Sequence, residues 1–129
     1  MTVIVTGAAG FIGFHVARQL IAQGRAVVGV DNLNDYYDPG LKQARLEQLS
    51  GHNAFTFRKQ DIQDRDATLA LAEEFPDTTE IVNLAAQAGV RYSLQNPYAY
   101  VESNVMGHLC MMELARRLPD LRHFVYASS

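Results

Sequence analysis

Three regularly spaced glycines are the first residues whose type and position suggest chemistry. Gly7, Gly10 and Gly13 follow the apolar run 2–6 and open a segment with helical periodicity. Glycine lets the chain reverse sharply, lets backbone N–H groups approach a phosphate, and lets a helix pack closely on a strand. A helix N-terminus adds partial positive charge. The pattern predicts a pyrophosphate-binding loop, although G-x-x-G-x-x-G alone also fits a merely tight turn.

An acidic residue stands where a ribose-binding carboxylate is expected. Asp31 ends the next apolar run, and such a carboxylate typically follows the glycine loop by about 20 residues. It can accept hydrogen bonds from the adenosine ribose but would repel a 2′-phosphate. No Arg or Lys occurs from Asn32 to Leu41, while Asp35 and Asp38 add negative charge. The sequence therefore predicts NAD rather than NADP as the cofactor.

Short β-branched runs alternate with helical patterns and must position these residues. Strands are expected over residues 2–6, 26–30, 54–58, 80–84 and 122–127. Helices are expected over residues 11–23, 41–49, 64–75 and 96–117. This alternation predicts a three-layer α/β domain, a doubly wound parallel sheet of Rossmann type with strand order 3-2-1-4-5. Ligands bind such sheets at the carboxyl ends of the strands, where the order reverses.

The last expected helix opens at Asn96-Pro97, a cap followed by a proline in the first turn. Apolar residues recur along it at helical spacing, which predicts its core-facing side. That predicted side consists of Val101, Val105, Leu109 and Met112. The fifth strand would have no following helix, so Phe124 and Tyr126 are expected to be partly bare and open to pairing with a neighbour.

The composition excludes several classes of protein. The chain has 129 residues, 48% hydrophobic and 19% charged, which predicts one domain with its own core. No apolar run approaches the roughly 20 residues of a membrane helix. A net charge of −3 with scattered basic residues argues against nucleic-acid binding. The single Cys110 excludes an internal disulfide and fits the cytoplasm, and the histidine spacing predicts no metal site.

Together these motifs resemble the extended short-chain dehydrogenase/reductases, the NAD-dependent sugar epimerase and dehydratase family. The resemblance covers the whole chain and rests on residues 6–13, 31–33, 61–62, 83–87 and 126–129 together with Asn104. Residues 31–38 and 85–93 are similar to those of UDP-glucuronate 4-epimerases. The resemblance implies a UDP-sugar substrate whose C4 configuration is inverted by transient hydride transfer to NAD. UDP-glucuronate and UDP-galacturonate are the expected pair of epimers. A homodimer is a candidate assembly.

The resemblance also assigns cofactor-binding roles beyond the glycines and Asp31. The further residues are Phe11, Ile12, Asn32, Asp61, Ile62, Leu84, Ala85, Ala86 and Asn104. Asp61 would accept from the adenine amino group, and Ile62 would pack on the ring. Small residues at 84–86 would let the backbone approach the cofactor, and Asn104 would hold the strand-end loops. The alternatives are a loop cap for Asp61, buried core for 84–86 and an exposed helix position for Asn104.

Substrate and catalytic residues are expected on the later loops. Gln87, Arg91 and Tyr92 belong to the predicted substrate rim, because an arginine fork suits a diphosphate or carboxylate. A merely solvated Arg91 is the alternative. The resemblance places the family's catalytic hydroxyl at Ser129, with Ser128 as the rival in the neighbouring register. Both could instead simply end the strand.

The family's catalytic Tyr-x-x-x-Lys pair does not occur in this sequence. No tyrosine has a lysine four residues later, and the only lysines are Lys42 and Lys59. We therefore expect residues 1–129 to be a partial dinucleotide-binding domain, the amino-terminal fragment of a longer protein. We expect this fragment to lack the catalytic pair and the substrate domain, and to have no turnover of its own. Two alternatives stand beside the epimerase: a nucleotide-sugar 4,6-dehydratase of the same family, and a non-catalytic NAD-sensing domain.

Overall fold

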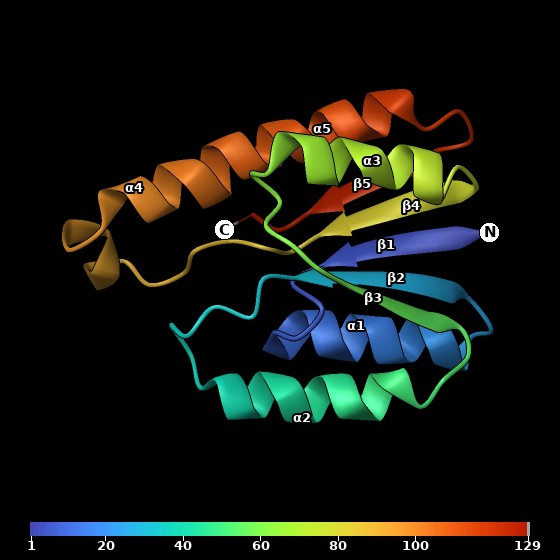
Figure 1. Ribbon diagram of the computed structural model, residues 1–129, viewed down its shortest axis with the longest axis horizontal. Helices are drawn as coiled ribbons and strands as arrows, with labels where there is room; N and C mark the ends of the chain where they lie inside the picture. The colour runs from blue at the N-terminus through green and yellow to red at the C-terminus, as the bar shows by residue number, and fades with distance from the viewer. Residues whose placement is uncertain (129) are drawn as a thin grey trace.

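The β-branched runs form one parallel sheet in the computed structural model, which describes residues 1–128. The strands are β1 (Thr2–Thr6), β2 (Ala26–Asp31), β3 (Phe55–Lys59), β4 (Thr78–Asn83) and β5 (His123–Tyr126). Their order across the sheet is β3-β2-β1-β4-β5, and every neighbouring pair is parallel. The predicted strand order is confirmed. Figure 1 shows the strand arrows side by side and pointing the same way.

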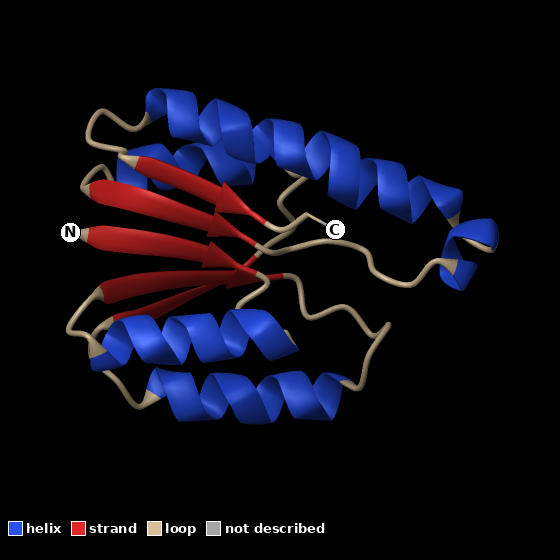
Figure 2. Ribbon diagram, turned by 180° about the vertical axis from the view of Figure 1, so that it is seen from behind, coloured by secondary structure: helices blue, strands red, loops and turns tan. Residues whose placement is uncertain are grey.

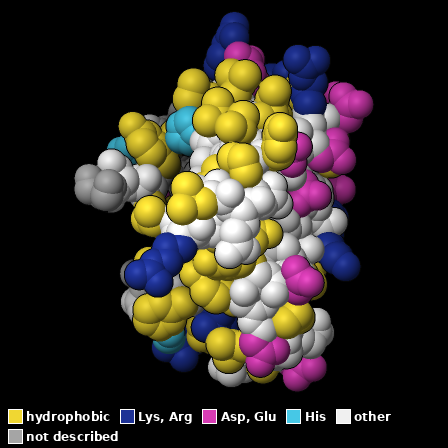
Figure 3. Space-filling view, turned by 90° about the vertical axis from the view of Figure 1, so that its left-hand side faces the viewer, with side chains coloured by type: hydrophobic (Ala, Val, Ile, Leu, Met, Phe, Trp, Pro, Cys, Tyr) yellow, Lys and Arg dark blue, Asp and Glu magenta, His cyan; other side chains and the backbone are white. Residues whose placement is uncertain are grey.

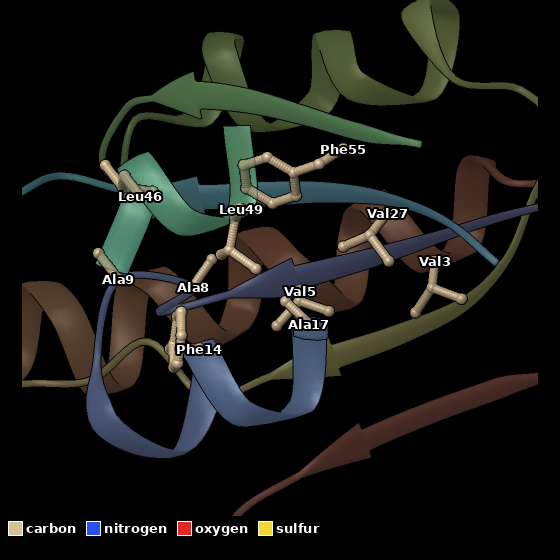
Figure 4. Close-up of a cluster of buried hydrophobic side chains, with 10 residues drawn as sticks. All are labelled: Val3, Val5, Ala8, Ala9, Phe14, Ala17, Val27, Leu46, Leu49 and Phe55. Carbon is tan, nitrogen blue, oxygen red and sulfur yellow. The ribbon is translucent and has the colours of Figure 1, made fainter. Parts of the chain in front are cut away.

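Strand β1 lies at the centre of the sheet and is buried along its whole length. Side chains alternate between the two faces of a strand. Val3 and Val5 accordingly join one core cluster with Phe14 of the first helix (Figure 4), while Ile4 joins the cluster on the opposite face. A strand covered on both faces excludes charged side chains, which is why this run is apolar apart from the threonines at its two ends.

Two helical layers cover the sheet, as Figure 2 shows. The helices α1 (Phe11–Ala22) and α2 (Pro39–Ser50) lie on one face, and α3 (Arg65–Glu74) and α5 (Gly107–Arg117) lie on the other. A 3₁₀ turn, η1 (Arg91–Leu94), and the short helix α4 (Pro97–Tyr100) precede the π-helical segment η2 (Val101–Met106). Within residues 1–128, no helix combines the length and apolar character needed to cross a membrane.

Side-chain caps set several helix starts. The Asp64 carboxylate accepts from the Ala67 N–H at 3.1 Å, and the Asn96 side chain accepts from the Ala99 N–H at 3.3 Å, so both predicted caps are confirmed. Helix α2 begins earlier than expected, because the Asp38 carboxylate accepts from the Gly40 N–H at 2.8 Å and Pro39 suits the first turn. This early start moves the first turn of α2 close to the end of β2.

The prediction for the core-facing side of the last helix is wrong. The four residues expected there are exposed, with exposed fractions between 45% and 64%. The buried residues of α5 are instead Gly107, Cys110, Met111 and Leu114. These have the same i, i+3, i+4, i+7 spacing as an apolar stripe, so periodicity alone could not choose between the two sides. The small Gly107 and Cys110 allow the close approach that decides the outcome.

Candidate functional site

A cavity of about 320 Å³ lies at the carboxyl ends of β1, β2 and β4, where the strand order reverses. Most of the residues expected to bind a cofactor line it. They are Gly7, Gly10, Phe11, Ile12, Gly13, Asp31, Asn32, Asp61, Ile62, Leu84, Ala85 and Ala86. The topology therefore brings together residues from four separate loops at the position where doubly wound sheets bind ligands.

The glycine loop has the geometry its residue types require. Gly7 has a φ of +69°, a conformation that favours glycine, and its N–H donates to the Val30 carbonyl at 2.7 Å. A Cβ on Gly13 would lie 2.7 Å from the Gly7 carbonyl carbon, so only glycine lets α1 start this close to the loop. The α1 N-terminus has neither a side-chain cap nor an acidic residue in its first turn. The free N–H groups and the partial positive charge of this helix end can therefore bind an anion.

Asp31 is buried and held rigidly at the edge of the cavity. Its Oδ2 accepts from the Ala9 N–H at 3.0 Å, and its Oδ1 accepts from the Leu33 N–H at 2.8 Å. The first bond ties the carboxylate to the glycine loop. The second follows a sharp turn in which Leu33 has a φ of +56°. Because an ionised carboxylate has about four acceptor positions, both oxygens can still accept from a ligand.

Lys42 is a site residue that sequence reasoning missed. It lies one turn into α2, is 7% exposed and lines the cavity. Its Nζ donates to the backbone and side-chain oxygens of Asn34 at 3.1 Å each, and lies 4.0 Å from the Asp31 Oδ1. Lys42 directly follows the segment 32–41, which contains no Arg or Lys. The signal that could have found Lys42 is the Asp38-Pro39 helix start, which places the first turn of α2 beside the strand ends.

The wall beyond Asp31 is built from the next two strand ends. The Asn32 Nδ2 donates to the Asp61 Oδ1 at 2.6 Å, so this carboxylate faces a side-chain donor across the cavity wall. Ile62 is buried and packs in the core cluster that contains Met111. Gln60 also lines the cavity, and its buried Nε2 has no hydrogen-bond partner among the described residues. Sequence reasoning did not select Gln60.

A threonine hydroxyl holds the fourth strand end beside the glycine loop. The Thr6 Oγ1 donates to the Asn83 Oδ1 at 2.6 Å and accepts from the N–H groups of Leu84 and Ala85 at 3.0 Å each. A Cβ on Gly7 would lie 3.1 Å from the Ala85 nitrogen. The segment 84–86 runs from half-buried to exposed, so it is cavity wall rather than fully buried core. Thr6 begins the family motif 6–13, but its residue type alone does not predict this bonding role.

Asn104 lies outside the cavity and clamps the chain that borders it. Its Oδ1 accepts from the Gln87 N–H at 2.8 Å, and its Nδ2 donates to the Gln87 carbonyl at 3.1 Å. Asn104 is exposed on η2, as the alternative of an exposed helix position expected. Its amide also holds a strand-end loop, as the resemblance implied. Gln87 itself is buried and lines the cavity.

A cluster of tyrosines joins the two loops beside the cavity mouth. Tyr36, which lines the cavity, packs on Tyr92 with ring centroids 4.8 Å apart, and Tyr92 lies 6.3 Å from Tyr100. The Tyr100 hydroxyl donates to the Ala88 carbonyl at 2.8 Å. Burial, reinforced by the neighbouring tyrosines, raises the pKa of Tyr100. We call these three residues the tyrosine bridge.

The remaining expected residues are not brought into the cavity. Arg91 is exposed at the start of η1, and neither it nor Tyr92 lines the cavity. Ser128 follows Ala127, which does line the cavity, and is itself exposed. Ser129 lies outside the described residues. Among residues 1–128, no group of three or more His, Cys, Asp or Glu side chains is placed to hold a metal ion.

Comparison with known proteins places the chain among similar sequences. The family model described as GDP-mannose 4,6 dehydratase matches residues 4–129. Protein CapI of Staphylococcus aureus is 45% identical over 130 residues, covering 100% of this chain and 38% of CapI. A probable UDP-glucuronate 4-epimerase of Rhizobium meliloti is 46% identical over 129 residues, covering 100% of this chain and 37% of the relative. The chain thus spans less than two fifths of these relatives.

Solved structures show the same fold with ligands. The UDP-glucuronic acid 4-epimerase of Bacillus cereus, in complex with UDP-glucuronic acid and NAD, superimposes with a TM-score of 0.86 at 30% identity. That match covers 100% of this chain and 40% of the epimerase. The dTDP-glucose 4,6-dehydratase DesIV of Streptomyces venezuelae, with NAD bound, has a TM-score of 0.80 at 29% identity. With the family model matching from residue 4 to residue 129, this chain belongs to the family of nucleotide-sugar epimerases and dehydratases.

Proposed function

We propose that residues 1–129 are the NAD-binding part of a nucleotide-sugar 4-epimerase. The observation that carries the proposal is the position of Asp31, locked by the Ala9 N–H beside the uncapped N-terminus of α1. One anion-binding helix end and one ribose-binding carboxylate face the same cavity, which is the arrangement that a dinucleotide requires. The B. cereus epimerase, which shares this fold, was solved with NAD.

Three features of the cavity fit NAD. Backbone N–H groups of the glycine loop and of the uncapped α1 N-terminus would hold the pyrophosphate, because Gly13 lets the helix start close to the loop. Asp31 would accept from the adenosine ribose hydroxyls. The orphaned Gln60 Nε2 offers a donor on the side where Asn32, Asp61 and Ile62 would border the adenine. An unpartnered buried donor is costly, and a ligand acceptor would satisfy it.

Bound NAD would supply a reversible hydride acceptor, and this chain's residues would orient it. Thr6 and the 84–86 segment would fix the wall beside its central part, and Asn104 would hold Gln87 toward the sugar end. Ser128 or Ser129 is proposed for the catalytic hydroxyl, next to the cavity-lining Ala127. Since no Tyr-x-x-x-Lys pair occurs in residues 1–129, we expect the chain alone to bind NAD without turnover.

For the whole protein we propose interconversion of UDP-glucuronate and UDP-galacturonate. Curated relatives named as UDP-glucuronate 4-epimerases match the full length of this chain at 43% to 46% identity. Gln87 is proposed to border the sugar, and its position in the cavity lining supports this role. Arg91 and Tyr92 are proposed as part of the outer rim, where the Arg91 fork would meet a carboxylate or phosphate.

NAD titration of this chain by calorimetry tests the cofactor proposal. Replacing Asp31 by Asn should weaken NAD binding about 10- to 100-fold, because hydrogen bonds to a charged acceptor contribute about 1.5–3 kcal/mol. Asp35→Asn is the matched control, since Asp35 is an exposed acid on the same loop, and it should change the affinity less than about twofold. Equal affinities for the two variants would contradict the proposed site.

A 4,6-dehydratase is the second candidate, favoured by the printed description of the family model and by DesIV. The two activities leave different products. An epimerase supplied with UDP-glucuronate yields UDP-galacturonate, whereas a dehydratase supplied with dTDP-glucose or GDP-mannose yields a 4-keto-6-deoxy sugar. Product analysis of the whole protein by NMR with each nucleotide sugar distinguishes them, and NAD binding without either product would favour the non-catalytic sensor.

A further inference from the structure

A buried cation stands directly beside the carboxylate proposed to bind the ribose. Lys42 Nζ lies 4.0 Å from the Asp31 Oδ1, and both side chains are less than a tenth exposed. A buried ammonium group requires a compensating charge or hydrogen bonds. Asn34 supplies two acceptors, each at 3.1 Å. Those two bonds use two of the three ammonium donors, and 4.0 Å is too long for a third bond to Asp31.

The third donor of Lys42 is therefore available to an anion that enters the cavity. Lys42 and Asn34 both line that cavity together with Asp31. The other cation of α2 that reaches this region, Arg45, donates to the Ala9 carbonyl at 3.0 Å and does not line the cavity. Asp61, the second carboxylate in the wall, accepts from Asn32. Lys42 is thus the one cavity-lining cation among the described residues, and Asp31 is the acid nearest to it.

We propose that Lys42 is a cofactor-specificity residue, a latent 2′-phosphate-binding cation whose charge Asp31 neutralises. This inference rests on the proposed binding of NAD at the same cavity. With Asp31 ionised, a 2′-phosphate would meet a carboxylate at the position where the ribose hydroxyls bind. Without that negative charge, the same position faces an ammonium group with a free donor. The preference for NAD then depends on one carboxylate rather than on the absence of basic residues.

Four proteins test the inference: the unmodified protein, Asp31→Asn, and the double variants Asp31→Asn with Lys42→Met and Asp31→Asn with Lys59→Met. Lys59 is the chain's other lysine, exposed and outside the cavity, so Lys59→Met is a matched removal of one charge. Methionine suits position 42 because it retains the length of the buried side chain. Binding of NAD and NADP is measured by calorimetry, and thermal melting confirms that each variant is folded.

The Asp31→Asn variant should bind NADP at least about 10-fold more tightly than the unmodified protein does. Adding Lys42→Met should remove that gain, whereas adding Lys59→Met should leave it within about twofold. Raising the salt concentration should weaken NADP binding to Asp31→Asn more than NAD binding, since the gain is electrostatic. Should the asparagine variant melt below the assay temperature, Asp31→Ser with the same partners takes its place.

Two failures are distinguishable. If the unmodified protein binds NAD and the Asp31 variants gain no NADP affinity, or if Lys42→Met leaves the gain intact, Lys42 has no specificity role and the proposed function stands. If the unmodified protein binds neither dinucleotide, the proposed function fails and the inference fails with it.

Discussion

Among single residues outside the cavity, Arg25 and Glu80 form a well-placed ion pair between the start of β2 and β4. The Arg25 Nη2 donates to the Glu80 Oε1 at 2.8 Å, and both side chains are between a quarter and a third exposed. The hydrogen bond from Arg25 lowers the pKa of Glu80 below its usual range, against the opposing effect of burial. A carboxyl group with a lowered folded-state pKa stabilises the protein above its unfolded pKa and ceases to do so as the pH falls.

Replacing Glu80 by Gln should therefore lower the free energy of unfolding near neutral pH by about 0.5–1 kcal/mol. The difference in unfolding free energy between the two proteins should shrink as the pH falls through the lowered pKa of Glu80. Protonated Glu80 is then uncharged, like the glutamine that replaces it. Urea unfolding at a series of pH values measures it. Glu47→Gln, at an exposed position on α2, is the control. A difference that persists undiminished throughout the acidic end of the pH series would contradict this account.

Residue types with narrow chemical uses could be predicted, and residues that act through placement could not. The glycines and Asp31 have recognisable spacing because the loop and the strand end impose it. Lys42 and Gln60 reach the cavity only because α2 and the β3 end fold back toward it. The Thr6 hydroxyl reads as an ordinary strand side chain until the end of β4 lies beside it.

At the scale of elements, the contact of α5 with the third strand end depends on one missing methyl group. A Cβ on Gly107 would lie 2.6 Å from both Cγ1 and Cδ1 of Ile62. Ile62 is buried in the core and is also a wall of the cavity. The closeness of this contact couples the position of α5 to the shape of the proposed adenine side.

Replacing Gly107 by Ala should lower the free energy of unfolding by about 1–3 kcal/mol, because overpacking forces Ile62 or α5 to shift. Gly51→Ala is the matched control. Nothing lies within 4 Å of its Cβ position, and its φ of −71° suits alanine, so it should be neutral or slightly stabilising. Chemical denaturation of both variants gives the comparison. If both were equally stable, the close contact of Gly107 with Ile62 would not be a packing constraint.

Element existence and caps could be predicted because they depend on local chemistry. Asp64 and Asn96 cap the helices that follow them, as expected from their types. The buried side of α5 depends instead on which of two apolar stripes allows the closer approach to the neighbouring layer. That choice is made by tertiary packing around Gly107 and Met111, which periodicity does not contain.

For the molecule as a whole, apolar surface remains on the face and edge formed by the last elements. Figure 3 shows hydrophobic side chains gathered over the layer of α4 and α5. Within residues 1–128, β5 pairs only with β4, and Val125 and Tyr126 are more than half exposed while Phe124 is half-buried. The strand order could be predicted because crossover handedness leaves few alternatives. The strand pattern does not predict which groups pack against this apolar surface.

The open edge of β5 should make the 129-residue chain self-associate as its concentration rises, since an unpaired strand edge templates further pairing. Val125→Lys should reduce this association, because a charged side chain on an edge strand disfavours it. The same substitution at Val90, an exposed valine away from the edge, should not. Sedimentation velocity over a range of concentrations measures the outcome, and identical behaviour of the two variants would refute the role of the edge.

The tyrosine bridge has a kinetic consequence. Tyr36 and Tyr92 belong to different loops, and the contact between their tilted rings joins those loops beside the cavity. Because this contact restrains both loops, we expect it to slow the exchange of a dinucleotide bound in the cavity. In the proposed epimerase reaction, which takes and returns the same hydride, slow exchange would be an advantage, because the cofactor ends each cycle as it began. Such a protein would carry its cofactor through successive rounds of catalysis instead of drawing on the free pool.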